Sequence, residues 1–358
     1  MSITLTIEQL VLPASADGTD AADLRALTEL NNAVCREDAD LADLDFTPAE
    51  MLSGLQDDAD RAHRVYVVRE GGRIAGACVF NYALAEPTAV DFDLMVLAAD
   101  RGHGIEDALL ARAEEETRAL GRTVMQAWTL HRGVATGPTV APATDWGEVE
   151  RTALSDQFLM NGFVLEQVER NSAFDLGGPF DDVQRRFDAA VAAAGPDYRL
   201  VEWTIPTPAE LQDGYAWALS RMSTDAPMGA LEIDEEKWDA GRVERREARI
   251  LAGGQMMAVS AVLHEPTGRL AAFNELVIGS EPDDVTHQYS TLVLKEHRGH
   301  RLGMLVKCAN ILRWRGIAPH SPKISTFNAE ENRPMLDINE AIGFVPVSYA
   351  GVWQKKLV

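Results

Sequence analysis

Residues 291–307 read TLVLKEHRGHRLGMLVK, and the interpretation of the whole chain starts from this stretch. Its first four residues are β-branched or apolar, as in a strand, whereas apolar residues recur at helical spacing from about Leu302 onward. A short turn containing Gly299 and Gly303 joins the two halves. A strand that turns at glycines into a helix leaves several backbone N–H groups directed into one concavity, at the positive end of the helix dipole. The stretch therefore predicts an anion-binding turn, with phosphate as the expected anion.

The local charge is consistent with an anion site. Residues 294–309 carry four basic side chains and one acidic side chain, a net charge of +3, and two histidines lie in the same turn. The whole chain has a formal net charge of −23. A helix that begins with solvated surface arginines would show the same local charge, so charge alone leaves both interpretations open.

Two motifs in this region resemble a known family. Residues 298–303 (RGHRLG) resemble the R-x-x-G-x-G/A signature of GNAT-type N-acetyltransferases, in which the loop after the fourth strand holds the pyrophosphate of acetyl-CoA; Arg301 replaces the middle glycine. Residues 332–344 (NRPMLDINEAIGF) resemble the second landmark of the family, N-x-x-A-x-x-x-Y-E-x-x-G-F, with Met335 at the alanine position. The resemblance covers nearly all of residues 22–357, in the first half only through an internal repeat.

Length and composition describe a globular protein with room for two domains. The chain has 358 residues, of which 46% are hydrophobic and 25% charged. It shows no signal-peptide pattern and no apolar run long enough to cross a bilayer, so we expect a cytoplasmic protein without a membrane partner. The three cysteines are widely spaced and predict reduced thiols and no metal site. The negative charge disfavours nucleic acid and favours a cationic partner.

The chain contains an internal repeat. Residues 72–76 (GRIAG) recur as 268–272 (GRLAA), and the turn at 101–103 (RGH) recurs as 298–300, at offsets of 196 and 197 residues. A Gly-Phe-Val triplet recurs at a shorter offset of 181 residues, because the first copy has an extra Gly- and Pro-containing loop near residues 131–145. Two copies of one unit predict two similar lobes rather than one large sheet.

The repeat also predicts the domain organisation. We expect an N-terminal GNAT-like domain at residues 1–176, a linker with a helix at 177–197, and a C-terminal GNAT-like domain at 198–358. Each copy should contain helices, three antiparallel strands, the turn with its helix, a further strand and helix, and a closing hairpin. In the second copy the patterns predict strands at 255–264, 270–278 and 287–294 and helices at 301–315 and 333–342. The fold class is therefore α/β (α+β), with each domain a twisted, mixed, mostly antiparallel sheet flanked by helices, as the resemblance also implies.

The two copies differ at the turn. In the first copy Glu106 stands where the signature has a small residue, and a carboxylate beside a pyrophosphate costs about 1–4 kcal/mol of Coulomb energy. The second landmark is also changed, since Arg151 and Phe158 occupy the positions of Asn332 and Asn339. We therefore expect the first copy to be structural and the second to bind acetyl-CoA.

The resemblance implies which residues of the second copy contact the cofactor. The backbone of the strand end would pair with the pantetheine arm, the turn would hold the pyrophosphate, and the start of the second helix would add a contact. These cofactor-binding residues are Val293, Leu294, Arg298, Gly299, His300, Arg301, Leu302, Gly303 and Asn332. The side chains of Arg301 and Lys307 are further candidates for phosphate contacts. Asn332 has a second, compatible interpretation as a helix N-cap.

The resemblance also places Asn339 where the family has a tyrosine thought to protonate the leaving thiolate. Because an amide cannot give up a proton at accessible pH, we expect Asn339 to donate a hydrogen bond to the sulfur. Water or another residue, such as Tyr349, remains open as the proton source.

Acetyl transfer also requires an unprotonated amine, and an alkylamine has a pKa near 10.4, so a general base is expected. Glu275 is the first candidate because it interrupts an apolar strand, where an unused carboxylate is costly. A glutamate on the solvent face of the strand is the alternative. His287 is the second candidate because its ordinary pKa suits the task, with an ordinary loop histidine as the alternative.

Together these features predict an acetyl-CoA-dependent N-acetyltransferase without a metal. It would transfer an acetyl group to a primary amine of a small cationic molecule or peptide, by direct attack on the thioester in the C-terminal domain. The alternative is a non-catalytic acyl-CoA-binding sensor or interaction protein. The expected partner is a small-molecule amine, with no nucleic acid or membrane partner, and the chain is expected to be a monomer or a homodimer.

Overall fold

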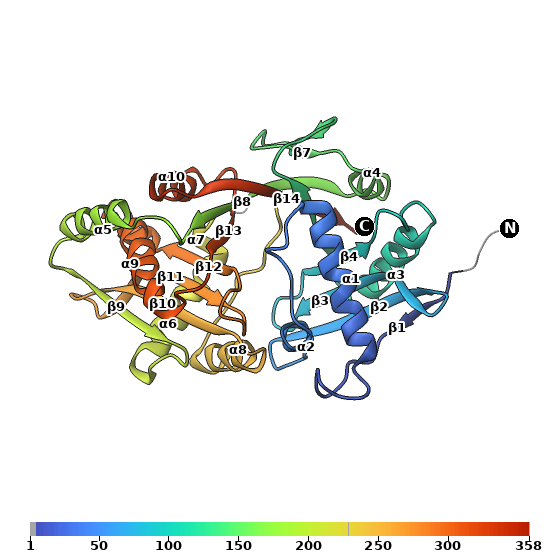
Figure 1. The fold of residues 1–358 in the computed structure, drawn as a ribbon, viewed down its shortest axis with the longest axis horizontal. Coiled ribbons are helices and arrows are strands. Elements are labelled where there is room, and N and C mark those ends of the chain that lie inside the picture. The colour runs from blue at the N-terminus through green and yellow to red at the C-terminus, as the bar shows by residue number, and fades with distance from the viewer. Residues whose placement is uncertain (1–4, 228, 358) are drawn as a thin grey trace.

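The computed structural model describes residues 5–227 and 229–357 (Figure 1). The strands are β1 (Ile7–Gln9), β2 (Arg61–Glu70), β3 (Arg73–Ala83), β4 (Ala89–Val96), β5 (Val124–Arg132), β6 (Thr139–Val140), β7 (Val149–Glu150), β8 (Val164–Asp175), β9 (Tyr198–Thr204), β10 (Met256–His264), β11 (Arg269–Ile278), β12 (Thr286–Val293), β13 (Lys323–Ala329) and β14 (Val345–Lys356). The helices are α1 (Ala22–Ala39), α2 (Pro48–Leu55), α3 (Ile105–Ala119), α4 (Ala153–Met160), α5 (Asp181–Ala194), α6 (Ala209–Ser220), α7 (Met222–Asp225), α8 (Ala240–Ala252), α9 (Leu302–Ile317) and α10 (Arg333–Ile342), with a short 3-10 helix η1 (Lys295–His297).

The predicted elements of the second copy are confirmed. The three predicted strands are β10, β11 and β12, and the two predicted helices are α9 and α10, with ends that differ from the prediction by at most two residues. The connecting helix α5 also lies where the linker was expected to contain a helix. The mixed α/β class with a mostly antiparallel sheet is likewise confirmed.

The sheet itself differs from the prediction of two separate lobes. Twelve strands form one continuous sheet in the order β1-β2-β3-β4-β5-β14-β8-β13-β12-β11-β10-β9. The order is symmetric about the central pair, β14 and β8. Strands β1 to β5 on one side correspond in order to β9 to β13 on the other. The expectation that two copies exclude one large sheet is therefore wrong.

The closing strands are exchanged between the halves. The predicted closing hairpins do not occur in the described residues, and each copy instead ends in one long strand, β8 or β14. β14 pairs with β5 of the first half, and β8 pairs with β13 of the second half, so both cross the middle of the molecule (Figure 1). Without closing hairpins, β5 and β13 would each have an open edge. β14 covers the edge of β5, and β8 covers the edge of β13. Under the proposed boundaries, each unit thus completes the sheet of the other.

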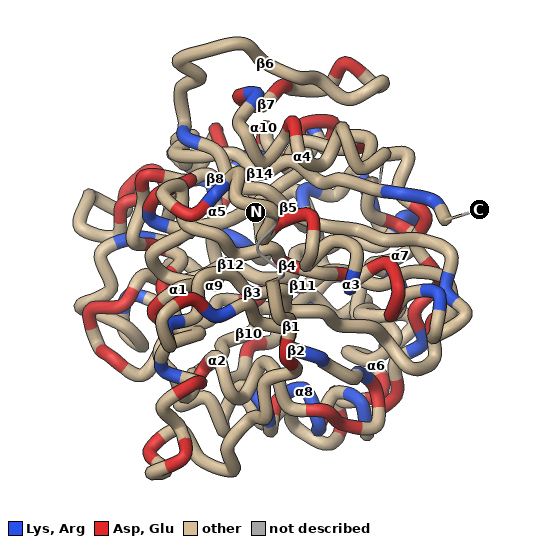
Figure 2. Tube along the Cα trace, turned by 90° about the vertical axis from the view of Figure 1, so that its right-hand side faces the viewer, with Lys and Arg blue, Asp and Glu red and all other residues tan. Residues whose placement is uncertain are grey.

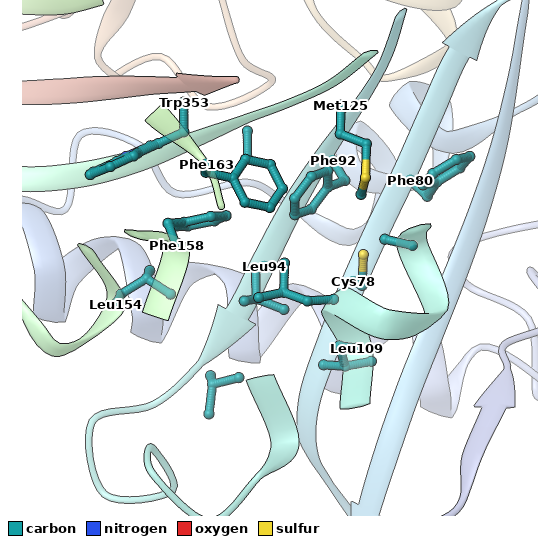
Figure 3. Packing of buried hydrophobic residues seen from close by; sticks show 14 of the residues in the cluster. Cys78, Phe80, Phe92, Leu94, Leu109, Met125, Leu154, Phe158, Phe163 and Trp353 are labelled. Atoms are coloured by element: carbon teal, nitrogen blue, oxygen red, sulfur yellow. The ribbon is translucent and has the colours of Figure 1, made fainter. Parts of the chain in front are cut away.

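The exchange also completes the hydrophobic core of the first half. Trp353 on β14 stacks on Phe158 of α4 with a centroid separation of 5.6 Å and an interplanar angle of 14°. Phe163 and Phe92 continue this cluster toward Leu109 of α3, as Figure 3 shows. Since an aromatic side chain of this size buries some 150–250 Å², the C-terminal strand is part of the N-terminal core.

Helices cover both faces of the sheet. The clusters formed with α3 and α4 and with α5, α9 and α10 lie on one face, and those formed with α1 and α2 and with α6 and α8 lie on the other. Alternation along β4 shows the division, since Leu94 packs with α3 whereas Met95 packs with α1. The turn that precedes α9 is thus carried by a different layer from α6 and α8.

The sheet opens at two places. Among its strand pairs only β4 with β5 and β12 with β13 are parallel in the described part of the chain, and both pairs are short. β12 and β13 are paired only at Thr286 with Ile324 and at His287 with Ser325, after which the strands diverge. Each half therefore contains a V-shaped opening, which we call the N-terminal V (β4 and β5) and the C-terminal V (β12 and β13).

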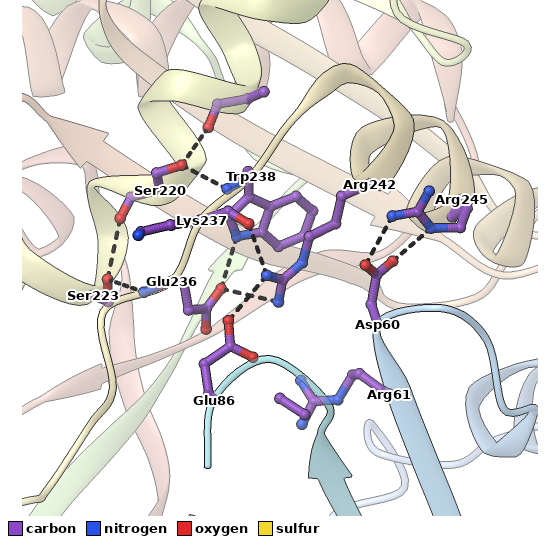
Figure 4. A network of polar contacts seen from close by, with 12 residues as sticks. Asp60, Arg61, Glu86, Ser220, Ser223, Glu236, Lys237, Trp238, Arg242 and Arg245 are labelled. Carbon is purple, nitrogen blue, oxygen red and sulfur yellow. Dashed lines mark hydrogen bonds and ion pairs between the residues drawn. The ribbon is translucent and has the colours of Figure 1, made fainter. Parts of the chain in front are cut away.

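Ion pairs hold the two halves together on the α2 and α8 side (Figure 4). Asp60 lies 2.7 Å from Arg245, and Glu86 lies 3.1 Å from Arg242. Acidic positions are spread over the trace and are not gathered on one side of the view (Figure 2). No helix in the described ranges is both long enough and apolar enough to cross a bilayer.

Candidate functional site

The turn before α9 presents unpaired backbone donors. Gly299 has φ of +90° and Arg301 has φ of +56°, so the chain bends twice through the left-handed region before the helix begins. The backbone N–H groups of residues 299–304 donate to no acceptor within the described ranges. Arg301 thus takes the glycine-like conformation at the position where the motif has glycine, which costs roughly 1–2 kcal/mol. The turn forms an exposed concavity of N–H groups suited to an anion.

The corresponding turn before α3 already binds a carboxylate of the protein at its first glycine. The backbone N–H of Gly102 donates to the carboxylate of Glu106 at 3.0 Å, and the Glu106 side chain is almost fully buried. A carboxylate therefore takes the position that a phosphate would need. The structure thus shows a physical difference between the two turns at the residue where the sequence motifs differ.

The first arginine of each turn donates a side-chain hydrogen bond to the end of the preceding strand. Arg298 donates from Nε to the carbonyl of Val293 at 3.4 Å and from its terminal nitrogen to the carbonyl of Asp225 at 2.6 Å. Arg101 makes the equivalent bond to the carbonyl of Val96 at 2.8 Å. Arg298 accordingly shapes the turn through its side chain.

Three other predicted cofactor residues show distinct environments. Both backbone groups of Leu294 are bonded within the protein, its N–H to Ala271 at 3.0 Å and its carbonyl to the N–H of His297 at 2.9 Å. A Cβ added to Gly303 would lie 2.9 Å from a terminal carbon of Ile338 on α10, so glycine permits the close approach of α9 and α10. Asn332 precedes α10 but makes no side-chain capping hydrogen bond. Its side chain is thus available to a ligand.

Asn339 is part of a buried polar group between α9 and α10. Its side-chain amide donates to Oδ1 of Asn328 at 2.7 Å, and its own Oδ1 accepts a hydrogen bond from Nζ of Lys307. Lys307 is fully buried, with its nitrogen 5.3 Å from the centre of the Phe344 ring, and burial lowers its pKa to about 7. Lys307 therefore faces α10 and not the turn, which differs from its predicted phosphate contact.

The burial of Lys307 could have been predicted from the sequence. Lys307 interrupts the apolar run of α9, where a charged side chain must find a partner inside the protein. Tyr349, the other residue considered as a proton source, lies on β14 and packs against the core of the first half.

Glu275 is enclosed by partners and does not reach a cavity. Its carboxylate pairs with the guanidinium of Arg246 at 2.6 and 2.8 Å, accepts a hydrogen bond from the hydroxyl of Tyr215, and accepts one from the backbone N–H of Ser290 at 3.2 Å. Its side chain is fully buried. A base needs a free lone pair facing the substrate, so the structure does not support the prediction that Glu275 is the base.

We expect replacement of Glu275 by Gln to affect stability more than catalysis. The amide retains the shape but leaves the buried guanidinium of Arg246 without its counter-charge, which should cost about 2 kcal/mol of unfolding free energy. Urea unfolding measures this loss, with Glu29→Gln as the control because Glu29 is exposed on α1. Unchanged stability together with a hundredfold lower kcat would restore Glu275 as the base.

Glu275 also faces an irregularity in β12. Its neighbours pair Asn274 with Thr291 and Leu276 with Gln288, so two residues of β12, Tyr289 and Ser290, lie opposite Glu275. This is a β-bulge, and the register between β3 and β4 in the first half has no such shift. The bulge lies beside the C-terminal V and redirects the side chains of β12 there.

A cavity of about 670 Å³, which we call the chamber, lies between the two halves. Its floor is formed by side chains from the six central strands: Asp93 and Met95 on β4, Trp128 and Leu130 on β5, Ala350 on β14, Glu169 on β8, Phe327 on β13, and His287 and Tyr289 on β12. Residues of α1 and the α1–α2 connection form one wall, and loops of the second half form the other. The chamber thus reaches both V openings from the face opposite the turns.

Several titratable groups of the chamber are perturbed. Burial, assisted by the neighbouring charge of Asp91, raises the pKa of Asp93 to about 6. Burial raises the pKa of Glu169 to about 7 and lowers the pKa of His287. His287, the second predicted base, therefore lies in the chamber and is held in its neutral form, which can accept a proton.

A buried oxygen beside the C-terminal V is available to a ligand. Gln288 donates to the hydroxyl of Thr326 at 2.9 Å, and its buried Oε1 has no hydrogen-bond partner in the described part of the chain. An amide N–H, of which pantetheine has two, would satisfy this oxygen. No group of three or more His, Cys, Asp or Glu side chains in the described ranges has metal-binding geometry.

Comparison with known proteins supports the fold. No family model and no curated protein sequence matches the chain. Among solved structures, it is similar to a tandem GNAT protein from the clavulanic acid biosynthesis pathway, with 25% identity, 98% coverage of both chains and a TM-score of 0.72. It also resembles in fold a GCN5-related N-acetyltransferase from Sphaerobacter thermophilus, with 14% identity, coverage of 98% of this chain and 95% of that one, and a TM-score of 0.56.

A third similar structure is the GCN5-related glucosamine N-acetyltransferase region of a fungal multi-domain β-N-acetylglucosaminidase. It has 15% identity and a TM-score of 0.58, over 98% of this chain and 38% of that one. The shared fold, the paired V openings and the turn motif place the protein in the GNAT superfamily of N-acetyltransferases. Within the superfamily it is a tandem protein with two GNAT units in one chain.

Proposed function

We propose that the protein is an acetyl-CoA-dependent N-acetyltransferase in which the C-terminal unit binds the cofactor. The observation that carries the proposal is the difference between the two turns. In the turn before α9 the N–H of Gly299 has no acceptor in the described ranges and no carboxylate lies at Gly303, whereas in the turn before α3 the carboxylate of Glu106 accepts the counterpart N–H of Gly102. A pyrophosphate supplies the acceptors that the first turn lacks and would be repelled by the carboxylate in the second.

The proposed site divides cofactor and acceptor between the two faces of the sheet. The turn at residues 298–303 would bind the pyrophosphate, Val293 and Gln288 would contact the pantetheine arm in the C-terminal V, and Asn332 would add a contact from α10. The acceptor amine would enter through the chamber on the other face. This arrangement brings the amine to the thioester without a shared entrance, which favours direct attack.

Two groups are proposed to move protons. The amine nitrogen attacks the thioester carbonyl carbon, and its proton passes to the neutral ring of His287, directly or through water. The bond from carbon to sulfur then breaks, and the departing thiolate takes a proton from the ammonium of Lys307. A donor with a pKa of about 7 gives its proton to a thiolate of pKa near 8.5 with a favourable driving force, which a lysine at its usual pKa would not. Asn339 would position Lys307, in place of the hydrogen bond to sulfur expected from the sequence.

The test is turnover of acetyl-CoA with a panel of amines comprising polyamines, amine antibiotics, amino acids and peptides. We expect release of free thiol above the rate without amine, in equal amount to acetylated amine detected by mass spectrometry. If CoA binds but no amine in the panel raises thiol release, the protein is a binder of acyl-CoA and the proposal fails.

A further inference from the structure

The residues that line the chamber indicate what kind of acceptor it would bind. Its floor crosses six strands, and only two of these, β12 and β13, come with the C-terminal V. Of the remaining floor strands, β4, β5 and β8 belong to the first unit and β14 belongs to the second. α1 and the α1–α2 connection, which form one wall, also belong to the first unit. A molecule that reaches the C-terminal V from the chamber therefore lies largely against residues of the first unit.

Most carboxylates that line the chamber are already engaged. Asp38 pairs with Arg101, Asp43 with Lys323 and Asp45 with Arg36, while Glu50 and Asp284 accept backbone N–H groups. These contacts explain their presence without a ligand.

Asp93 and Glu169 are different. Neither forms an ion pair with any side chain in the described part of the chain, although both lie on the chamber floor. Asp93 is exposed, whereas Glu169 is partly buried. A partly buried carboxylate without a counter-charge is costly, as the raised pKa of Glu169 reflects. The two residues lie three strand spacings and two residues apart in the sheet, which is roughly 16 Å between Cα atoms, so one cation cannot contact both. A cationic ligand group at Glu169 would remove the cost there.

The rest of the lining sets the shape of the ligand. Trp128, Phe327 and Tyr289 supply aromatic surface, and Leu94 and Leu154 extend the apolar lining into the N-terminal V. The volume of about 670 Å³ falls within the range of small-molecule sites, which are mostly apolar with a few placed polar groups. The chain of such a ligand is therefore apolar.

The sheet register sets the length of the ligand. His287 pairs with Ser325 on β13, and Glu169 on β8 pairs with Ala329, so the two residues are separated by two strand spacings and by four residues along the strand. With about 4.8 Å between strands and about 3.3 Å per residue, their Cα atoms are roughly 16 Å apart. Because both side chains extend into the chamber, a ligand that contacts both has charged groups on the order of 10 Å apart.

We propose that the chamber binds an elongated diamine with an apolar chain, one amine at the C-terminal V beside His287 and the second, as a cation, at Glu169. The first unit thus selects the acceptor for acetylation in the second unit. This inference rests on the proposed function for the reaction but concerns binding, which is measured without acetyl-CoA.

The test compares 1,8-diaminooctane with octylamine by isothermal titration calorimetry at pH 8. The two probes share the chain and differ in the second amine. We expect the wild-type protein to bind the diamine at least tenfold more tightly, and the variant Glu169→Gln to bind both probes within about twofold of each other. Glu29→Gln, an exposed carboxylate on α1, should leave the ratio unchanged. Near-UV circular dichroism checks that the variants keep their packing.

Equal affinity of the two probes for the wild-type protein, or an undiminished preference in the Glu169→Gln variant, overturns the proposal. The binding result can be told apart from the result for the reaction. Preference for the diamine without any acetylation supports the chamber assignment and removes the enzyme proposal. Acetylation of amines at rates that Glu169→Gln does not change supports the enzyme proposal and removes the chamber assignment.

Discussion

Replacing Gly303 by glutamate is expected to lower the affinity of the protein for CoA about a thousandfold. Gly303 corresponds to Glu106 in the repeat, so the substitution places in the second turn the carboxylate that fills the first. The new side chain would accept the N–H of Gly299 and repel the pyrophosphate, and a loss of about 4 kcal/mol corresponds to the expected change. Calorimetric titration with CoA measures it.

Two variants serve as controls for this experiment. Gly303→Ala adds only the Cβ near Ile338, whose terminal carbon can move, so its affinity should stay within about threefold of wild type. Glu106→Gly removes the carboxylate from the first turn, and we expect the C-terminal site to be unaffected and a second, weaker site to become measurable. If Gly303→Glu binds CoA normally and Glu106→Gly alters the main site, the cofactor lies in the first unit.

The second large effect is expected on catalysis. Lys307→Met should lower kcat by about a hundredfold to a thousandfold, because general-acid assistance is worth this much, while CoA affinity changes little. The unbranched apolar side chain fills the space of the lysine stem and removes only the ammonium. Initial rates of thiol release as a function of acetyl-CoA concentration separate the two effects.

Two further readouts distinguish proton donation from a structural role. The donor must be protonated, so the wild-type kcat should fall as pH rises through about 7, and Lys307→Met should lose this alkaline decline. Thioester donors whose leaving thiol has a low pKa do not need a proton, and they should restore most of the lost rate. A variant that is equally slow with such donors would show that Lys307 only supports the packing of α9 and α10.

The prediction from sequence was most accurate where local pattern decides structure. β10, β11, β12, α9 and α10 were found because apolar spacing, glycines and prolines act on neighbouring residues. The failed predictions concern pairing over long distances. The closing hairpins were expected because adjacent strands usually pair, whereas β8 and β14 pair with strands of the other half.

In the candidate site, too, local motifs could be predicted whereas contacts between distant residues could not. The turn motif and Glu106 were recognisable as single residues in a known spacing, and the structure adds that Glu106 accepts the N–H of Gly102 whereas the N–H of Gly299 is unbonded in the described ranges. The enclosure of Glu275 could not be predicted because its partners, Arg246 and Tyr215, are 29 and 60 residues away. Lys307 was noticed, but the side chain it meets, Asn339, lies on another helix.

The sequence by itself determined that the chain has two copies of one unit and that only the second keeps the glycine that an anion-binding turn requires at Gly303. These features follow from backbone conformations and side-chain volumes that a few adjacent residues specify. Only the tertiary structure decided that the units share one sheet and enclose a chamber in which Asp93 and Glu169 form no ion pair with the described residues. The physical reason is that strand pairing and burial depend on which distant surfaces meet, and no local sequence pattern specifies these contacts.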